Sequence, residues 1–225
     1  MTRRFLRENS LGLVFGLLFL FTLLGQAVAG HAVFNDQQVA DGLGPVSMGR
    51  YLTSADFMVD VAENWQSEYL QFFLFIMLTV WLVQKGSPES KKLDETGLES
   101  DERQKVGPYA KDDSPAWAKA DGLRRVLLSN SLGLVMGGIF VLSWLAQSVA
   151  GVSAFNERQL SERQEPVSWA GYLVEPDFWN RTLQNWQSEF LAVASMAVLS
   201  IYLRQRGSPE SKPVGSAHTS TGVEG

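Results

Sequence analysis

The strongest constraint on the fold is that the chain repeats itself. Shifted by 121 residues, positions 3–91 align with 124–212 without a gap, and 41 of the 89 aligned positions are identical. Both copies contain the string Asn-Trp-Gln-Ser-Glu, at 64–68 and at 185–189. This self-similarity indicates an internal duplication, so any structure assigned to one copy must also suit the other.

Long apolar runs in each copy predict membrane-spanning helices. Residues 11–29 and 132–150 carry no charge, and about 20 apolar residues are enough to cross roughly 30 Å of hydrocarbon. Each copy also has a shorter apolar block, 69–83 or 190–203, which reaches spanning length only if the helix is counted from the preceding tryptophan. We therefore expect an all-α membrane protein with four transmembrane helices, arranged as two tandem helical hairpins of the same orientation.

Two alternatives compete with four spans. The first run has a basic start and ends in Ala27-Val28-Ala29, a pattern typical of a cleaved signal peptide. Against cleavage, the run is longer than the usual signal core, and the same element recurs at 132–150, where no signal peptide can lie. The second alternative is that the short second span is re-entrant, which would export the positively charged linker and so conflict with the positive-inside rule.

Repeat boundaries and local composition divide the chain into four segments. The segment between the repeats mixes both charge signs with Gly, Pro and Ser, a composition that predicts disorder, and the tail looks similar. The segments are the first two-span repeat (1–91), the polar cytoplasmic linker (92–121), the second two-span repeat (122–212) and the disordered tail (213–225). Gly86 and Gly207, each followed by Ser-Pro, predict the stop of the second helix in each repeat.

The distribution of positive charge predicts the orientation. Segments 1–10, 84–129 and 204–225 hold 15 of the 19 lysines and arginines, and the two hairpin loops hold the rest. Cytoplasmic loops are enriched in these residues. We therefore expect a multi-pass protein of the cell membrane, with both termini and the linker in the cytoplasm and the lipid bilayer as its first partner.

Composition argues against several kinds of site. A net charge of -5 leaves no basic surface for nucleic acid, and the absence of cysteine excludes disulfides and thiolate ligands. His31 and His218 are the only histidines, and neither has a counterpart in the other copy, so a symmetric haem or metal site is not expected. Without a catalytic triad, phosphate loop or metal-ligand spacing, we expect a protein that is not an enzyme and that uses no cofactor.

Four polar residues are predicted to lie within the membrane: Gln26, Glu68, Gln147 and Glu189. Helix rise places all four about 10 Å to the outer side of the midplane. An ionisable group at that depth is costly unless it is paired, so we expect Gln26 to donate a hydrogen bond to Glu68, and Gln147 to Glu189. In one reading the carboxylates only face interfacial water at a helix start; in the other they approach each other and bind a proton or cation.

Two further sets of residues are expected to position the helices. Trp and Asn at the membrane edge are typical interfacial anchors, and glycines spaced four apart let helix backbones approach closely. The predicted anchors are Asn64, Trp65, Asn185 and Trp186, and the predicted packing glycines are Gly12, Gly16, Gly133 and Gly137. The glycine pairs predict contact either between the first and third spans or within one hairpin.

The repeated strings resemble those of a family of uncharacterised bacterial multi-pass membrane proteins, known as a domain of unknown function. The resemblance rests on Asn-Ser-Leu-Gly-Leu-Val, the glutamine near the end of the first span, Pro-Val-Ser with Tyr-Leu, Asn-Trp-Gln-Ser-Glu and Gly-Ser-Pro-Glu-Ser-Lys, and covers residues 3–91 and 124–212. It implies a membrane location and no activity. Two functions stay open: a non-enzymatic structural or partner-binding role, and a small proton, cation or solute channel or carrier that uses Glu68 and Glu189.

Overall fold

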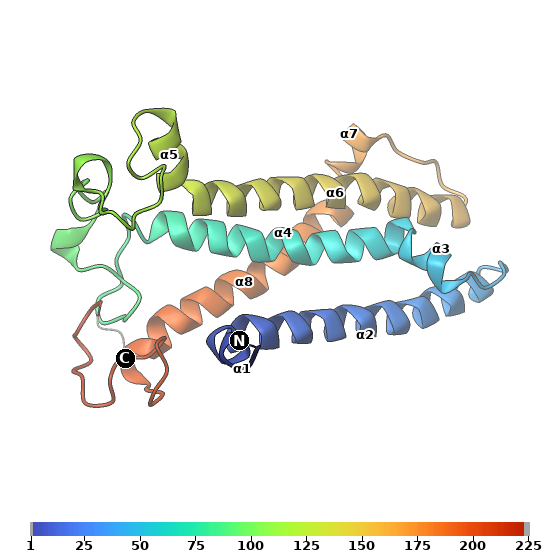
Figure 1. Ribbon diagram of the computed structural model, residues 1–225. Coiled ribbons are helices and arrows are strands. Elements are labelled where there is room, and N and C mark those ends of the chain that lie inside the picture. The colour runs from blue at the N-terminus through green and yellow to red at the C-terminus, as the bar shows by residue number, and fades with distance from the viewer. Residues whose placement is uncertain (1, 223–225) are drawn as a thin grey trace. The chain divides into compact units, whose positions relative to one another are not determined.

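The computed structural model describes residues 2–222, and this part of the chain is all-helical, as the sequence predicts (Figure 1). It contains eight α-helices, two short 3-10 helices and no strand. The α-helices are α1 (Thr2–Glu8), α2 (Ser10–Ala40), α3 (Met48–Leu52), α4 (Ala55–Leu78), α5 (Leu123–Ser129), α6 (Ser131–Ser161), α7 (Trp169–Tyr172) and α8 (Pro176–Tyr202). The 3-10 helices, Leu93–Glu95 and Gly107–Tyr109, lie in the linker, whose predicted disorder stays a prediction.

The chain forms two compact units, and each combines parts of both repeats. Unit 1 comprises Met1–Ala62 and Ala146–Val174, and unit 2 comprises Glu63–Leu145 and Glu175–Gly225. Helices α4 and α6 each contribute to both units. The repeat boundaries come from the alignment of the sequence with itself, whereas the units are defined by spatial contact. The repeat boundaries therefore stay a prediction.

Two of the described helices, α2 and α6, are long and apolar enough to cross a membrane. Each has 31 residues, or about 46 Å at 1.5 Å per residue, so each would extend beyond the hydrocarbon at one end or both. Helix α4 is shorter than expected: it ends at Leu78, and turns follow where the sequence predicted helix as far as Val83. The predicted stop at Gly86 is therefore wrong, because the helix has already ended.

In unit 1, an asparagine of α2 holds the loop that follows this helix. Asn35 Oδ1 accepts a hydrogen bond from the backbone N–H of Val46 at 2.7 Å, and Asn35 Nδ2 donates to the carbonyl oxygen of Val46 at 3.2 Å. The same two bonds join Asn156 of α6 to Val167, at 2.8 and 2.9 Å. This loop clasp satisfies backbone groups that have no helical partner and explains why Phe-Asn and Pro-Val-Ser occur in both copies.

A buried tyrosine completes each clasp. Tyr51 is 2% exposed and packs against the rings of His31, Phe34 and Phe57. Its hydroxyl lies so close to Gly30 of α2 that a Cβ there would be 2.1 Å from Tyr51 Oη. Burial, and then the charges of Asp60 and Asp56, raise the pKa of Tyr51, which favours the neutral phenol.

The second clasp repeats this arrangement. Tyr172 is fully buried against Phe155, and a Cβ on Gly151 would lie 2.7 Å from Tyr172 Oη. Gly30 and Gly151 end the repeated Val-Ala-Gly strings. The glycine in each string is therefore required by the close approach of a tyrosine.

In unit 2, the packing glycines of α6 face α4. A Cβ on Gly133 would lie 3.2 Å from Met77 Sδ, and a Cβ on Gly137 would lie 3.0 Å from the ring of Phe73. For Gly12 and Gly16 of α2, nothing described lies within 4 Å of the equivalent position. Contact between α2 and α6 through these glycines involves both units and remains a prediction.

The repeated Gly-Ser-Pro-Glu-Ser-Lys strings fold alike after α4 and α8. Ser90 Oγ accepts a hydrogen bond from Gln84 N at 2.8 Å, and Ser211 Oγ accepts one from Gln205 N at 2.9 Å. Each serine also donates to the carbonyl of the lysine that follows it, at 3.1 Å. We call these two segments, 84–91 and 205–212, the exit segments.

Lys212 ties the C-terminal tail to the first exit segment. Lys212 as a whole residue is 1% exposed. Its ammonium group donates to the carbonyl oxygens of Gly86 at 2.6 Å and His218 at 3.0 Å. The carbonyl oxygens of Ser220 and Ala217 lie within 3.3 Å of the same nitrogen. The backbone N–H of Gly222 also donates to Ser87 O at 3.1 Å. The tail is thus held by backbone carbonyls that surround one buried cation.

Lys212→Met is expected to release this tail. A hydrogen bond to a charged group contributes roughly 1.5–3 kcal/mol, and 1.4 kcal/mol corresponds to a factor of ten. Hydrogen–deuterium exchange of residues 213–222 should therefore become at least about tenfold faster. Lys91→Met is the matched control, because the corresponding Lys91 bonds Gly97 O and Glu99 within the linker and makes no recorded bond to the tail. Unchanged exchange in Lys212→Met would contradict the role of Lys212 in holding the tail.

Candidate functional site

In unit 2, the two Asn-Trp-Gln-Ser-Glu strings lie on α4 and α8, and equivalent parts of these helices meet. The contacts pair Glu63 with Arg181 and Gln66 with Trp186. The contact residue on α8 advances from 181 to 186 as the contact residue on α4 advances from 63 to 66. The two helices therefore run parallel. We call the pairs formed by Glu63, Gln66 and Glu68 of α4 with Arg181, Trp186 and Glu189 of α8 the polar seam.

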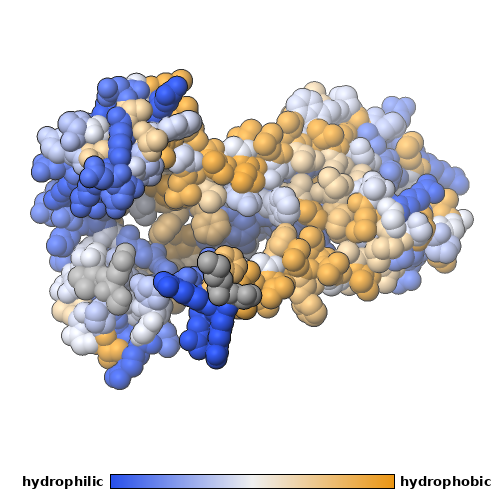
Figure 2. Space-filling model, viewed as in Figure 1, coloured by the Kyte–Doolittle hydropathy of each residue, from blue (hydrophilic) through white to orange (hydrophobic). Residues whose placement is uncertain are grey.

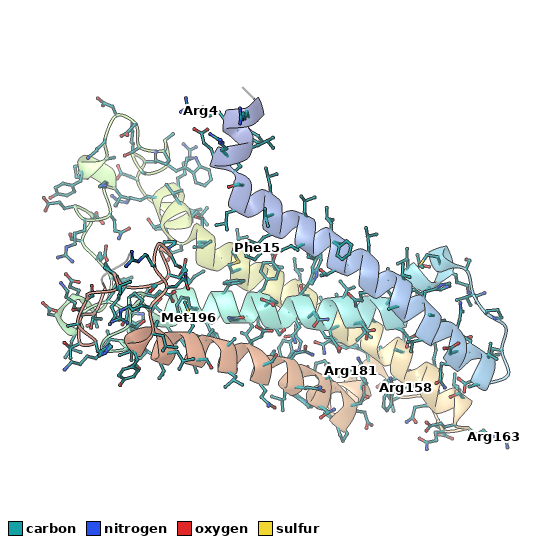
Figure 3. The ribbon with its side chains drawn as sticks, turned by 90° about the horizontal axis from the view of Figure 1, so that it is seen from below. Arg4, Phe15, Arg158, Arg163, Arg181 and Met196 are labelled. Carbon is teal, nitrogen blue, oxygen red and sulfur yellow. The ribbon has the colours of Figure 1, made fainter. Side chains whose placement is uncertain are left out.

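An ion pair forms the first step of the seam. Arg181 Nη1 donates to Glu63 Oε2 at 2.9 Å, and Arg181 Nε lies 3.6 Å from Asp177 Oδ2, one turn earlier on α8. The side chains of Glu63 and Arg181 are 16% and 26% exposed, so the pair is partly shielded from water. Figure 3 shows Arg181 near the beginning of α8 and Met196 nearer its end. A partly buried, hydrogen-bonded pair contributes more to helix association than an exposed one.

A hydrogen bond between the two repeated strings forms the second step. Trp186 Nε1 donates to Gln66 Oε1 at 2.7 Å, and Gln66 is completely buried. Within the described residues, Gln66 Nε2 has no acceptor. Gln187, which takes the same position in the second copy, is exposed. Identical strings therefore occupy different environments.

Aromatic side chains of α6 and α8 surround this hydrogen bond. The indole of Trp144 lies 5.8 Å from that of Trp186 between ring centroids, and it stacks against Phe140 and Phe178. Trp179 meets Trp144 edge to face. Such pairs add roughly 0.5–1.5 kcal/mol each beyond their buried area. Sequence reasoning missed this cluster; the available signal was tryptophan at position 144, where the first copy has leucine.

The two glutamates of the strings form the third step. Glu68 is exposed and Glu189 is half-buried, and each lies within one helical turn of the Gln66–Trp186 hydrogen bond. Two carboxylates that approach each other favour a shared proton or a bound cation. Whether these two glutamates approach each other stays a prediction.

The other predicted site residues lie outside the seam. Gln26 of α2 and Gln147 of α6 belong to unit 1, whereas both glutamates belong to unit 2, so the expected Gln–Glu hydrogen bonds remain predictions. Gln147 is completely buried and Gln26 is half-buried. Among the proposed anchors, Trp65 is 43% exposed, whereas Trp186 donates its hydrogen bond inside unit 2.

Two more of the proposed anchors are asparagines, of which Asn64 is exposed and Asn185 is half-buried. Asn185 Nδ2 donates to Arg181 O at 2.9 Å. The backbone carbonyl of each asparagine accepts a hydrogen bond from the serine three residues later, at 2.9 Å from Ser67 Oγ and 2.8 Å from Ser188 Oγ. Across residues 2–222, no group of three or more His, Cys, Asp or Glu side chains could hold a metal ion. The contacts that form the seam are a hydrogen bond and an ion pair between helices.

Comparison with known proteins connects the chain to one family. No curated protein and no solved structure matches it. A family model described as a domain of unknown function (DUF6766) matches residues 2–223, which include both strings of the seam, both loop clasps and both exit segments. Because this match covers nearly the whole chain, the protein belongs to the DUF6766 family.

Proposed function

We propose that this protein is a multi-pass membrane protein with a non-enzymatic, structural or partner-binding role. The observation that carries the membrane location is the exposure of apolar side chains on α2: Leu11 is 74% exposed, Phe15 64% and Phe21 76% (Figures 2 and 3). Exposed apolar surface on this scale is unfavourable in water, and lipid would cover it. Helix α6 has the same length and is apolar enough to cross a bilayer.

The parallel course of α4 and α8 supports four spans. If the chain is a duplicated two-span hairpin, both copies enter the bilayer in the same sense, and their second helices run parallel. The seam contacts join residues separated by 118 and 120 positions, close to the repeat offset of 121. Helices α4 and α8 would then be the second and fourth spans.

The contacts between side chains in the polar seam support a structural role. Arg181 binds Glu63, and Trp186 binds Gln66, so these polar side chains hold one helix to the other. Polar side chains between membrane helices commonly serve this purpose. We infer that the seam stabilises a helical scaffold that lies in the bilayer and presents its loops to partners.

Reporter fusions test this proposal. Reporters that are active only in the cytoplasm should work at both termini and at residue 105, and they should be silent at residues 43 and 164 in the hairpin loops. The protein should stay in the membrane fraction after alkaline carbonate extraction. Export of the linker reporter, or release by carbonate, would contradict the four-span topology.

A small channel or carrier is the second candidate, because Glu68 and Glu189 each lie within one helical turn of the hydrogen bond that joins α4 to α8. The double variant Glu68→Gln/Glu189→Gln should abolish proton or cation flux in proteoliposomes, and Glu210→Gln, an exposed exit-segment control, should leave it unchanged. Flux that survives the double variant would remove these residues from the mechanism. Absence of flux in the parent protein would leave the structural role.

A further inference from the structure

Unit 2 contains an apolar groove between the later parts of α4 and α8. Its walls are formed by Leu74, Phe75 and Leu78 of α4 and by Val193, Ala194 and Ala197 of α8. Its volume is about 510 Å³, within the range of roughly 300–1,000 Å³ typical of ligand sites.

Polar residues mark the two ends of this groove. Gln71 lies at one end, immediately past the seam, and Gln84, Ser87, Glu89 and Ser90 of the first exit segment line the other. An apolar groove with polar groups at its ends suits an amphiphilic ligand, which has an apolar tail and a polar head. The exit-segment end offers more polar groups, so the head of the amphiphile belongs there.

Comparison of the two copies explains why the groove is open. At the 121-residue offset, Ala194 and Ala197 correspond to Phe73 and Ile76. Ala194 and Ala197 line the groove, and their side chains are smaller than the phenylalanine and isoleucine at the equivalent positions of α4. The small side chains leave room between α4 and α8 at this point.

We propose that the groove binds one acyl chain of a zwitterionic phospholipid. The exit-segment end carries both charge signs, because Glu89 lines the groove and the exposed Lys85 follows Gln84. A zwitterionic head also carries both charge signs, so it is complementary to this end of the groove as a whole. A free fatty acid would supply only a second carboxylate. The inference rests on the membrane location proposed above.

Native mass spectrometry of the full-length protein, extracted from phosphatidylethanolamine nanodiscs into mild detergent, tests the proposal. The parent protein should retain a phospholipid. Ala194→Phe/Ala197→Ile, which copies the side chains of the other repeat, should lower this retention at least about tenfold, because bulky side chains fill the volume. Ala192→Phe adds similar bulk at an exposed position that does not line the groove, and it should leave retention unchanged.

Photocrosslinking of the unmodified chain provides a second measurement that does not depend on a variant's folding. A phosphatidylethanolamine probe with a photoreactive acyl chain should label peptides covering 74–82 and 193–197 more strongly than peptides of α2. Equal labelling of α2, equal labelling by a phosphatidylglycerol probe, retention of a free fatty acid instead, or retention that Ala194→Phe/Ala197→Ile does not reduce would overturn the proposal. A protein that is released by carbonate would instead overturn the membrane location itself.

Discussion

Gly30→Ala is expected to lower the free energy of unfolding by about 1–3 kcal/mol, the usual cost of overpacking a well-filled site. The new Cβ would lie 2.1 Å from Tyr51 Oη and 3.1 Å from Tyr51 Cζ. The tyrosine has little room to move, because it is 2% exposed and contacts three other rings. Thermal unfolding in detergent, followed by circular dichroism, measures the loss.

The same helix provides the control. Apart from the local backbone and the chain neighbours, no described heavy atom lies within 4 Å of a Cβ built on Gly25. Gly25→Ala should therefore be neutral or stabilising, since alanine favours helix more than glycine. Gly30→Ala combined with Tyr51→Phe should recover most of the loss, because the closest atom is the hydroxyl oxygen. If Gly25→Ala and Gly30→Ala behave alike, the clasp is not what requires glycine at position 30.

Trp186→Phe is the second change with a large expected effect, of about 1–3 kcal/mol in the free energy of unfolding, because it leaves a buried acceptor without a donor. Gln66 is completely buried, and its Oε1 accepts a hydrogen bond from Trp186 Nε1. Gln66→Leu should have a similar cost, since it leaves the indole N–H without its acceptor. Denaturant titration of the detergent-solubilised protein measures both.

A double-mutant cycle separates the hydrogen bond from packing. Gln66→Leu/Trp186→Phe removes donor and acceptor together and should cost less than the sum of the single changes, with a coupling energy of roughly 0.5–3 kcal/mol. The matching pair in the other string, Gln187 and Trp65, is exposed. Gln187→Leu should therefore change stability by less than about 0.5 kcal/mol. Additive effects at 66 and 186 would show that the seam is not held by this bond.

The repeated strings are now largely explained by packing in the two units. Val-Ala-Gly allows a tyrosine to approach the helix, Phe-Asn and Pro-Val-Ser form the loop clasp, and Gly-Ser-Pro-Glu-Ser-Lys forms the exit segment. Each of these roles is local, involving residues within about 25 positions of one another, so both copies can fulfil it independently. The sequence showed that the strings recur, but did not show these contacts.

The sequence by itself determined the all-helical class, because apolar periodicity and run length distinguish helices from strands without reference to neighbours. It also identified α2 and α6 as helices of membrane-spanning length. It placed the end of α4 too late, since the apolar residues after Leu78 continue the helical pattern while the backbone turns back to line the groove.

Only the tertiary structure decided which residues of the two repeated strings contact each other. A self-comparison treats the two Asn-Trp-Gln-Ser-Glu strings as interchangeable, yet Gln66 is buried and bonded to Trp186 while Gln187 and Trp65 are exposed. Residues that are not repeated contribute to this difference: Trp144 packs against Trp186, and the first copy has leucine at the position equivalent to Trp144. Helical periodicity specifies the face on which a side chain lies, but contact depends on the shape of the opposite surface, which is a property of the packed helices.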